Sequence, residues 1–503
     1  MLEKSYPLDW KEIIFKFLFF VVVCGVSVLT GMITVILPKY AFLMTLPFIA
    51  LFFILFPTIH NLPPLNKISF LFKLWLAMTI LCPTFIVITI SETEINPVRL
   101  LAMILVLFSL LFILRSIYFR ELMLRFYKEY PQILILFLAF IGFQAIGSLT
   151  RGANTEAPYL FFRQVLEVYI PVFILLVVFS EKGKLVNIVN IALGLSSLVI
   201  IFGIVELIIQ QNVYLAFLPN QLISAEDYVQ NVISSKVRGE YRVQSVFSHP
   251  LVLGQFLVMT LPLYFYKIIT TPSNTLKLVC VIFIFFSIFV MNSTGNRSVY
   301  AALGVELVFV IFIFLIRLYH IKKTSFWGWI LAVASPFILL GVLLLTFIGK
   351  DFLLAGSANH AASTQARQEM VSRTVNIFAS DPAGLLTGYG TGQAAAKVGF
   401  ISPSGVLTID SYILTVILES GILGLISYIA FFIYVFVVGM KVLKTTSVYK
   451  TLVVSLMVSI LGYITVAIIL SQVDILRFSF IFSFMVVMLA SLSNKIAPQV
   501  QNR

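Results

Sequence analysis

Long runs of apolar residues recur along most of the chain and constrain its fold more than any other feature. A run of about 20 apolar residues is long enough to cross a bilayer as an α-helix. The sequence therefore predicts an all-α polytopic membrane protein with about 14 transmembrane helices. We expect these helices at about 13–37, 40–57, 68–90, 98–118, 131–149, 162–180, 185–209, 250–268, 276–292, 298–317, 326–348, 410–438, 450–471 and 475–492.

The composition excludes soluble enzymes, secreted disulfide scaffolds and disordered regulators. Hydrophobic residues make up 60% of the 503 residues and charged residues 11%, against roughly 45–50% and about 25% in soluble domains. The three cysteines lie inside apolar runs and the four histidines are scattered, so we predict neither disulfides nor a metal site. The first apolar run is too long for a signal peptide, and we expect it to remain in the protein.

Basic residues on the short connections predict the orientation of the chain. Lysine and arginine concentrate on the connections that share a side with both termini, for example Lys67, Lys128, Lys277 and Lys444. The positive-inside rule assigns this side to the cytoplasm. We therefore expect a multi-pass protein of the cytoplasmic (inner) membrane with both termini in the cytoplasm.

We treat the chain as one integral membrane domain, 1–503. Two of its connections on the predicted outer side are long, residues 210–249 and 349–409. Long connections often carry function. Most basic residues on this side are arginines, whose planar guanidinium groups bind phosphate in a bidentate manner. This bias predicts a phosphorylated ligand at the outer face, and pairing with outer glutamates is the alternative interpretation. The arginines are Arg99, Arg151, Arg163, Arg238, Arg242, Arg297, Arg367, Arg373 and Arg477.

Two polar motifs precede the eighth and tenth predicted helices. RVQSVFSHP, from Arg242 to Pro250, contains His249, which is a candidate general base or a helix cap. NSTGNRS, from Asn292 to Ser298, contains Arg297, which either binds a ligand or extends from a helix end to the membrane interface.

Two further motifs belong to the second long connection. Arg367 and Arg373 precede the segment DPAGLLTGYGTG at 381–392, whose glycines would let the backbone approach a ligand closely. IDSYILTVILESGILGL, at 409–425, begins with Asp410, a candidate base or helix cap, and carries Glu419 within a predicted helix.

In this order the motifs resemble the O-antigen ligase/polymerase superfamily of bacterial envelope glycosyltransferases, over about residues 240–425. The resemblance implies a GT-C-like, metal-independent inverting enzyme without a cofactor. It also implies undecaprenyl-diphosphate-linked glycans as substrates, outside the cytoplasmic membrane. Ligases of this superfamily usually begin the last motif with His-Asn, whereas this chain has Asp410–Ser411, which favours a polymerase.

The predicted function is polymerisation of lipid-linked oligosaccharide units into a surface polysaccharide of the O-antigen, capsule or exopolysaccharide type. Asp410 or His249 would deprotonate the acceptor hydroxyl, while arginines bind the donor diphosphate. The expected partners are the donor and acceptor lipids, the bilayer and a chain-length regulator, but not nucleic acid. An O-antigen ligase, a peptidoglycan-type polymerase and a lipid-linked oligosaccharide flippase are alternatives. The candidate arginines are Arg163, Arg242, Arg297, Arg367 and Arg373.

Overall fold

The computed structural model describes most of the chain from residue 65 onward. The described residues are 65–83, 85–90, 93–179, 182–219, 222–223, 241–321, 358–401, 407–444, 449–471 and 475–501. Residue contacts divide the chain into two compact units. The first consists of Met1–Leu65 and Leu107–Leu124, and the second of Asn66–Val106 and Arg125–Arg503. In the first unit the described residues contain the end of α4 (Pro97–Arg115) and most of α5 (Ile117–Glu129).

The second unit is almost entirely helical. Its two strands, β1 (Ile88–Ile90) and β2 (Thr93–Ile95), are the only strands in the described part of the chain and pair antiparallel. The helices in chain order are α3 (Leu65–Leu81), α6 (Pro131–Leu149), α7 (Ala157–Gln164), the π-helix η1 (Val165–Tyr169), α8 (Ile170–Val178), α9 (Lys182–Ile209), α10 (Val213–Phe217), α12 (Pro250–Thr270), α13 (Asn274–Ser293), α14 (Arg297–Ile321), α16 (Ala358–Ser380), α17 (Pro382–Thr387), α18 (Ala394–Val398), α19 (Tyr412–Lys444), α20 (Lys450–Ile469) and α21 (Leu476–Gln501).

Nine of the helices that the structure describes are long and apolar enough to cross a membrane. They are α6, the continuous α7–η1–α8 helix, α9, α12, α13, α14, α19, α20 and α21. The prediction of an all-helical multi-pass membrane protein is confirmed at this level. The expected helices at 13–37, 40–57 and 326–348 lie outside the described residues, so the total of fourteen stays a prediction.

Proline positions account for two departures from the predicted boundaries. The helix expected at 68–90 ends at Leu81, because Pro83 has no N–H to donate and disfavours helical backbone at the residue before it. The helix expected at 162–180 begins earlier, at Ala157, and widens into η1 just before Pro171. Pro171 cannot donate the next helical hydrogen bond.

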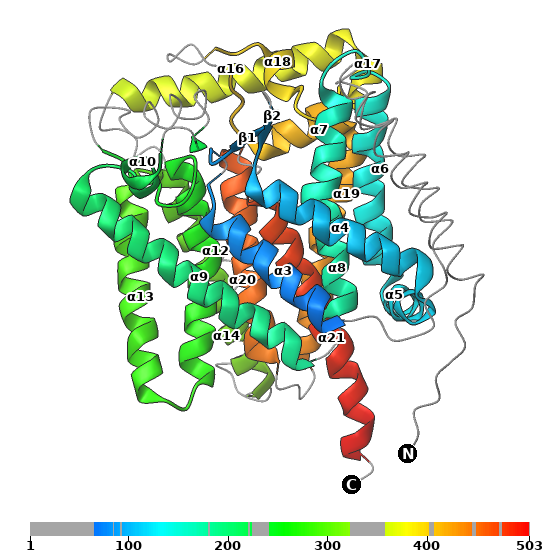
Figure 1. Cartoon of the computed structure of the whole chain (residues 1–503), viewed down its shortest axis with the longest axis vertical. Helices are drawn as coiled ribbons and strands as arrows, with labels where there is room; N and C mark the ends of the chain where they lie inside the picture. The colour runs from blue at the N-terminus through cyan, green and yellow to red at the C-terminus, as the bar shows by residue number, and fades with distance from the viewer. Residues whose placement is uncertain are drawn as a thin grey trace, which may run out of the picture. The chain divides into compact units, whose positions relative to one another are not determined.

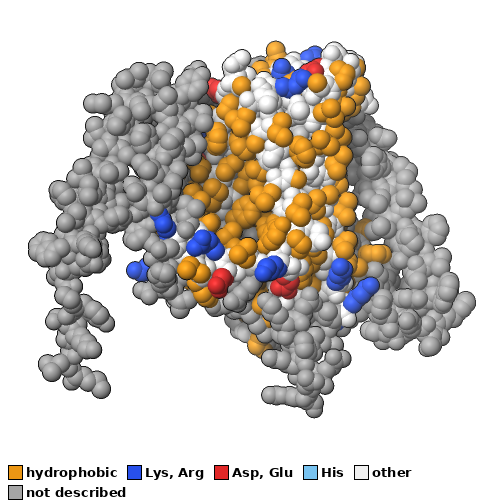
Figure 2. All heavy atoms as spheres, turned by 90° about the vertical axis from the view of Figure 1, so that its right-hand side faces the viewer, with side chains coloured by type: hydrophobic (Ala, Val, Ile, Leu, Met, Phe, Trp, Pro, Cys, Tyr) orange, Lys and Arg blue, Asp and Glu red, His pale blue; other side chains and the backbone are white. Residues whose placement is uncertain are grey.

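The surface of the helices matches a hydrocarbon environment. Figure 2 shows one face of the molecule, where charged side chains gather toward two edges and hydrophobic side chains fill the band between them. Large apolar side chains on the helices are widely exposed, such as Phe285 at 66% and Ile433 at 59%. Such a surface is stable against lipid and unfavourable in water.

Parts of both long connections lie toward one end of the second unit. In Figure 1, α16 runs across the ends of the membrane helices with α17 and α18 beside it, and α10 lies toward the same end. The C-terminal end of α21 lies at the opposite end. Among the membrane helices, α6 packs against α19, and α20 packs against α12, α14 and α19.

Candidate functional site

The second long connection places Arg367 beside Asp410. Arg367 lies on α16 and Asp410 stands two residues before α19. Arg367 Nε donates a hydrogen bond to Asp410 Oδ2 at 3.3 Å, and the two side chains are 38% and 31% exposed. The Asp410 amide donates to Met370 Sδ at 3.2 Å, which fixes the backbone against α16. We call Arg367, Asp410 and the following Ser411 the Arg–Asp site.

An apolar cavity of about 540 Å³ adjoins the Arg–Asp site. Arg367, Asp410 and Ser411 contribute its polar side, while isoleucines of α19 and α20 form much of the rest. The cavity shares Ile413, Ile429 and Ile464 with a second one of about 590 Å³ that continues along α19. The charged pair therefore stands at one end of an apolar path between α19 and α20.

Ser411 has an unusual backbone conformation that the sequence did not reveal. Its φ of 79° lies in the left-handed region, which costs roughly 1–2 kcal/mol for a residue with a Cβ atom. The Ser411 carbonyl accepts a hydrogen bond from the Thr415 amide at 3.2 Å, in the first turn of α19. The turn at Ser411 leads the chain into α19 while the Asp410 carboxylate bonds to Arg367.

The glycine-rich segment 388–392 packs across a break in α19. The break is at Gly421, where φ is 72° and ψ is −178°. Tyr389 and Gly390 donate from their amides to the carbonyls of Leu418 and Glu419, at 2.7 and 3.0 Å. The Gly392 amide donates to Glu419 Oε1 at 2.7 Å. In the structure these glycines thus approach protein backbone, where the sequence predicted close approach to a ligand.

A second ion pair on the same end involves Arg151 and Asp381. The Asp381 carboxylate caps α17 by accepting from the Gly384 amide at 3.1 Å, and it also accepts from Arg151 and the Tyr389 hydroxyl. The hydrogen bond from Arg151 holds the pKa of Asp381 below its usual value. Burial, followed by the bond to Asp381, raises the pKa of Tyr389 to about 12. Arg151, which the sequence predicts to lie on the outer side, therefore has a carboxylate partner.

The two earlier motifs meet at the start of α12 and α14. The Val243 amide donates to the Ser293 carbonyl at 3.1 Å, and Arg242 Nε donates to the Thr294 carbonyl at 2.7 Å. The buried Glu206 carboxylate of α9 holds the same segment by accepting from the amides of Gln244 and Ser245. We call Arg242, His249, Arg297 and the turn 292–296 the histidine site.

His249 is the N-cap of α12. Its Nδ1 accepts a hydrogen bond from the Leu251 amide at 3.1 Å. Burial disfavours the imidazolium form and the nearby charge of Arg242 adds to this, so the pKa of His249 falls to about 4. The ring is consequently neutral at pH 7, with one nitrogen occupied by the cap. Of the two interpretations that the sequence left open, the structure places His249 in the geometry of the helix cap.

Three of the other candidate arginines have different surroundings. Arg163 Nε donates to Glu167 Oε1 at 3.1 Å, and Arg99 donates to the same oxygen at 2.9 Å. Arg373 donates to Glu369 and to the Gly399 carbonyl at the end of α18. Arg297 is exposed at the first residue of α14. Of the candidate arginines, Arg367 is the one that lines the cavity beside Asp410.

Within the described ranges, no group of three or more His, Cys, Asp or Glu residues is arranged to hold a metal ion. Comparison of the chain with protein-family models, with curated proteins and with solved structures finds no match. A function is therefore inferred from the residues of the site and from their order in the sequence.

Proposed function

We propose that this protein is a membrane glycosyltransferase that polymerises polyprenyl-diphosphate-linked oligosaccharide units on the outer face of the cytoplasmic membrane. The observation that carries the proposal is the Arg–Asp site at the end of an apolar cavity. A lipid-linked donor joins a charged diphosphate to a long apolar chain, and a cation beside an apolar wall complements both parts. The motif order, which resembles the O-antigen ligase/polymerase superfamily, supports the same function.

In the proposed reaction Asp410 is the general base. Its carboxylate takes the proton of an acceptor sugar hydroxyl, whose oxygen attacks the anomeric carbon of the donor sugar. The bond from that carbon to the diphosphate oxygen breaks, and the polyprenyl diphosphate leaves with both bonding electrons. Arg367 neutralises the negative charge that develops on the leaving group. One displacement of this kind inverts the configuration at the anomeric carbon.

The ion pair between Arg367 and Asp410 gives the site a resting state. Both side chains are about one-third exposed, and exchanging such a pair for another charged partner changes the free energy by about 1 kcal/mol or less. In the proposal, an arriving diphosphate takes over the Arg367 guanidinium. This exchange frees the Asp410 oxygen that must accept the acceptor proton.

The distribution of charge favours an enzyme over a flippase. A flippase that carries a charged lipid head across the bilayer needs polar groups along its path. In the described part of the chain, the two cavities along α19 carry charged residues only near their ends, Arg367 and Asp410 at one end and Lys441 and Lys444 at the other. The intervening walls are almost entirely apolar, which suits a lipid tail.

The proposal is tested by Asp410→Asn in purified protein reconstituted with lipid-linked oligosaccharide, with polymer length measured on gels. The amide keeps the shape of the carboxylate but cannot take the proton, so we expect chain extension to fall by at least about 100-fold. Asp381→Asn is the matched control, because Asp381 is also an outer carboxylate paired with an arginine. We expect this control to polymerise within about threefold of the wild-type rate.

Near wild-type polymerisation by Asp410→Asn would exclude Asp410 as the base. Equal loss in both Asn variants, together with lower thermal midpoints, would indicate that the ion pairs serve folding. Failure of the wild-type protein to extend any lipid-linked oligosaccharide would contradict the proposed function itself.

A further inference from the structure

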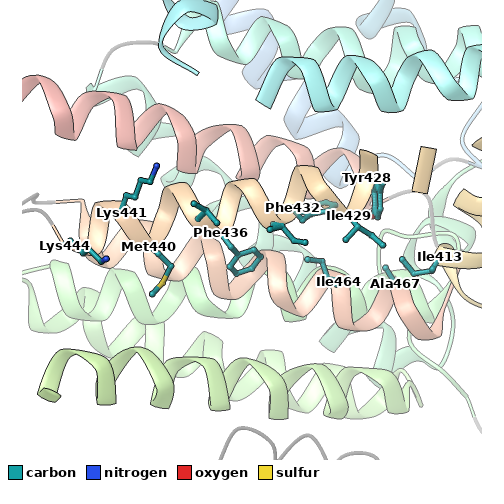
Figure 3. Close-up of a pocket in the computed structure, with 12 residues that line it drawn as sticks. Ile413, Tyr428, Ile429, Phe432, Phe436, Met440, Lys441, Lys444, Ile464 and Ala467 are labelled. Carbon is teal, nitrogen blue, oxygen red and sulfur yellow. The ribbon is translucent and has the colours of Figure 1, made fainter. Parts of the chain in front are cut away.

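A second cavity continues along α19, with lining residues from Ile413 to Lys444. It has a volume of about 590 Å³ and lies against α19 and α20. Figure 3 shows Phe432, Phe436 and Ile464 in its middle part, with Lys441 and Lys444 at one end. Apart from the two lysines and the Tyr428 side chain, the lining residues are apolar. The cavity therefore combines a long apolar surface with a cationic end.

The length of this surface matches one leaflet of a bilayer. The lining residues Ile429, Ile433, Val437 and Lys444 recur at the spacing of one helix face. From Ile429 to Lys444 the helical rise gives about 22 Å. Half of a bilayer, including its headgroup region, is about 20–22 Å thick. The row is thus long enough to extend from the headgroup level to about the middle of a bilayer.

The charge at the end of the row suits an anion. Lys441 and Lys444 stand in the last turn of α19, where the helix dipole favours cations. The short connections on this side are rich in lysine, and the sequence predicts that the side is cytoplasmic. Juxtamembrane lysines at this level attract anionic lipid headgroups.

We propose that this cavity binds one anionic phospholipid of the cytoplasmic leaflet. Its phosphate contacts Lys441 and Lys444, and one acyl chain lies against Phe432 and Phe436. A polyprenyl diphosphate donor fits this end less well, because its single anionic group is needed at Arg367, at the far end of α19. The two cavities share Ile413, Ile429 and Ile464, but their charged ends are separate, so phospholipid binding at Lys441 and Lys444 can be measured apart from polymerisation.

The test is native mass spectrometry of delipidated full-length protein mixed in detergent with phosphatidylglycerol or with phosphatidylcholine. We expect Lys441→Gln/Lys444→Gln to weaken binding of the anionic lipid by about tenfold and to leave the weaker zwitterionic binding unchanged. Val437→Trp keeps both lysines but fills the apolar wall, and Val437 is exposed enough to accept the larger side chain. We expect this variant to weaken binding of both lipids.

Lys67→Gln/Lys277→Gln is the matched control. It removes two lysines from the same predicted side, and neither of them lines the cavity. We expect it to bind phosphatidylglycerol as the wild type does. Equal loss in both double variants would show a general effect of charge and overturn the site. Unchanged binding of phosphatidylglycerol by the Lys441→Gln/Lys444→Gln variant would overturn it as well.

Discussion

His249 and Asp410 each end a long connection and stand just before a membrane helix, but their surroundings differ. His249 is half-buried, accepts a hydrogen bond from the first turn of α12 and lies near the charge of Arg242. Asp410 bonds to Arg367 across the chain, is 31% exposed and lines a cavity. The same position relative to a helix therefore allows two different sets of contacts, and we propose that these contacts decide the role of each residue.

The difference also concerns the arginine in each site. Arg242 donates through Nε to a backbone carbonyl in the turn before α14, so it helps to join two segments of the chain. Arg367 donates to a side chain, the half-exposed carboxylate of Asp410, beside a cavity. A guanidinium bonded to a backbone carbonyl helps to hold the fold, whereas one paired with a half-exposed carboxylate can exchange its partner for a ligand at little cost in free energy. The predictions below test this contrast.

The largest effect is expected for Arg367→Gln. Removing a cation that stabilises a leaving group typically lowers the rate by roughly 100-fold, and polymer formation in reconstituted membranes measures the loss. Arg367→Lys keeps the charge without the planar fork and should fall between this variant and the wild type. Arg373→Gln is the control, because Arg373 bonds within α16 and to the end of α18.

For Arg373→Gln we expect a lower thermal midpoint and a much smaller loss of activity than for Arg367→Gln. If both variants lose activity to the same extent while their thermal midpoints stay at the wild-type value, the two arginines act on substrate together. That result would contradict the proposal that Arg367, and not Arg373, binds the leaving group.

A smaller effect is expected for His249→Asn. Asparagine is a good N-cap, so it can replace the bond to the Leu251 amide. We expect polymerisation within about threefold of the wild type and an unchanged thermal midpoint. His249→Ala lacks the cap and should destabilise the protein by about 1 kcal/mol. Inactive His249→Asn protein with an intact fold would assign the general base to His249 and reverse the comparison.

The pH dependence of stability provides a further test of the histidine site. The pKa of His249 is about 4 in the folded protein and about 6.5 in an unfolded chain. Between these values the unfolded state binds more protons, so this residue's contribution to stability is complete above about pH 6.5 and declines as the pH falls toward 4. The thermal midpoint of His249→Asn, measured against pH in detergent, should fall less steeply than that of the wild type. Identical slopes would show that His249 titrates normally.

Hydropathy predicted most of the described helices because a bilayer imposes one requirement on every span. The ranges expected at 131–149, 250–268 and 450–471 agree closely with α6, α12 and α20. The prediction was wrong at 68–90, where the helix ends at Leu81. Apolar composition continues past that point, but Pro83 ends the helix, so hydropathy alone extended it too far.

The candidate site was less accessible from the sequence. Proximity in sequence could not show that Arg367 meets Asp410, since 43 residues separate them. The left-handed Ser411 also carries no signal, because glycine or asparagine would be the usual residue at such a φ. The cavity walls include Ile413 and Ile464, which lie on two separate helices. In the sequence these two residues indicate only that they belong to membrane-spanning helices. Long-range packing determines these features.

The smallest effect is expected for Arg163→Gln. The sequence groups Arg163 with the diphosphate-binding arginines, but in the structure it shares Glu167 with Arg99. Its side chain is 36% exposed, and such a pair contributes about 0–1 kcal/mol to stability. Because Arg99 still neutralises Glu167 in the variant, we expect the thermal midpoint to stay within about 2 °C of the wild type. We also expect polymerisation within about twofold. A loss as large as that of Arg367→Gln would place the diphosphate near α7 and would move the catalytic site away from the cavity at Asp410.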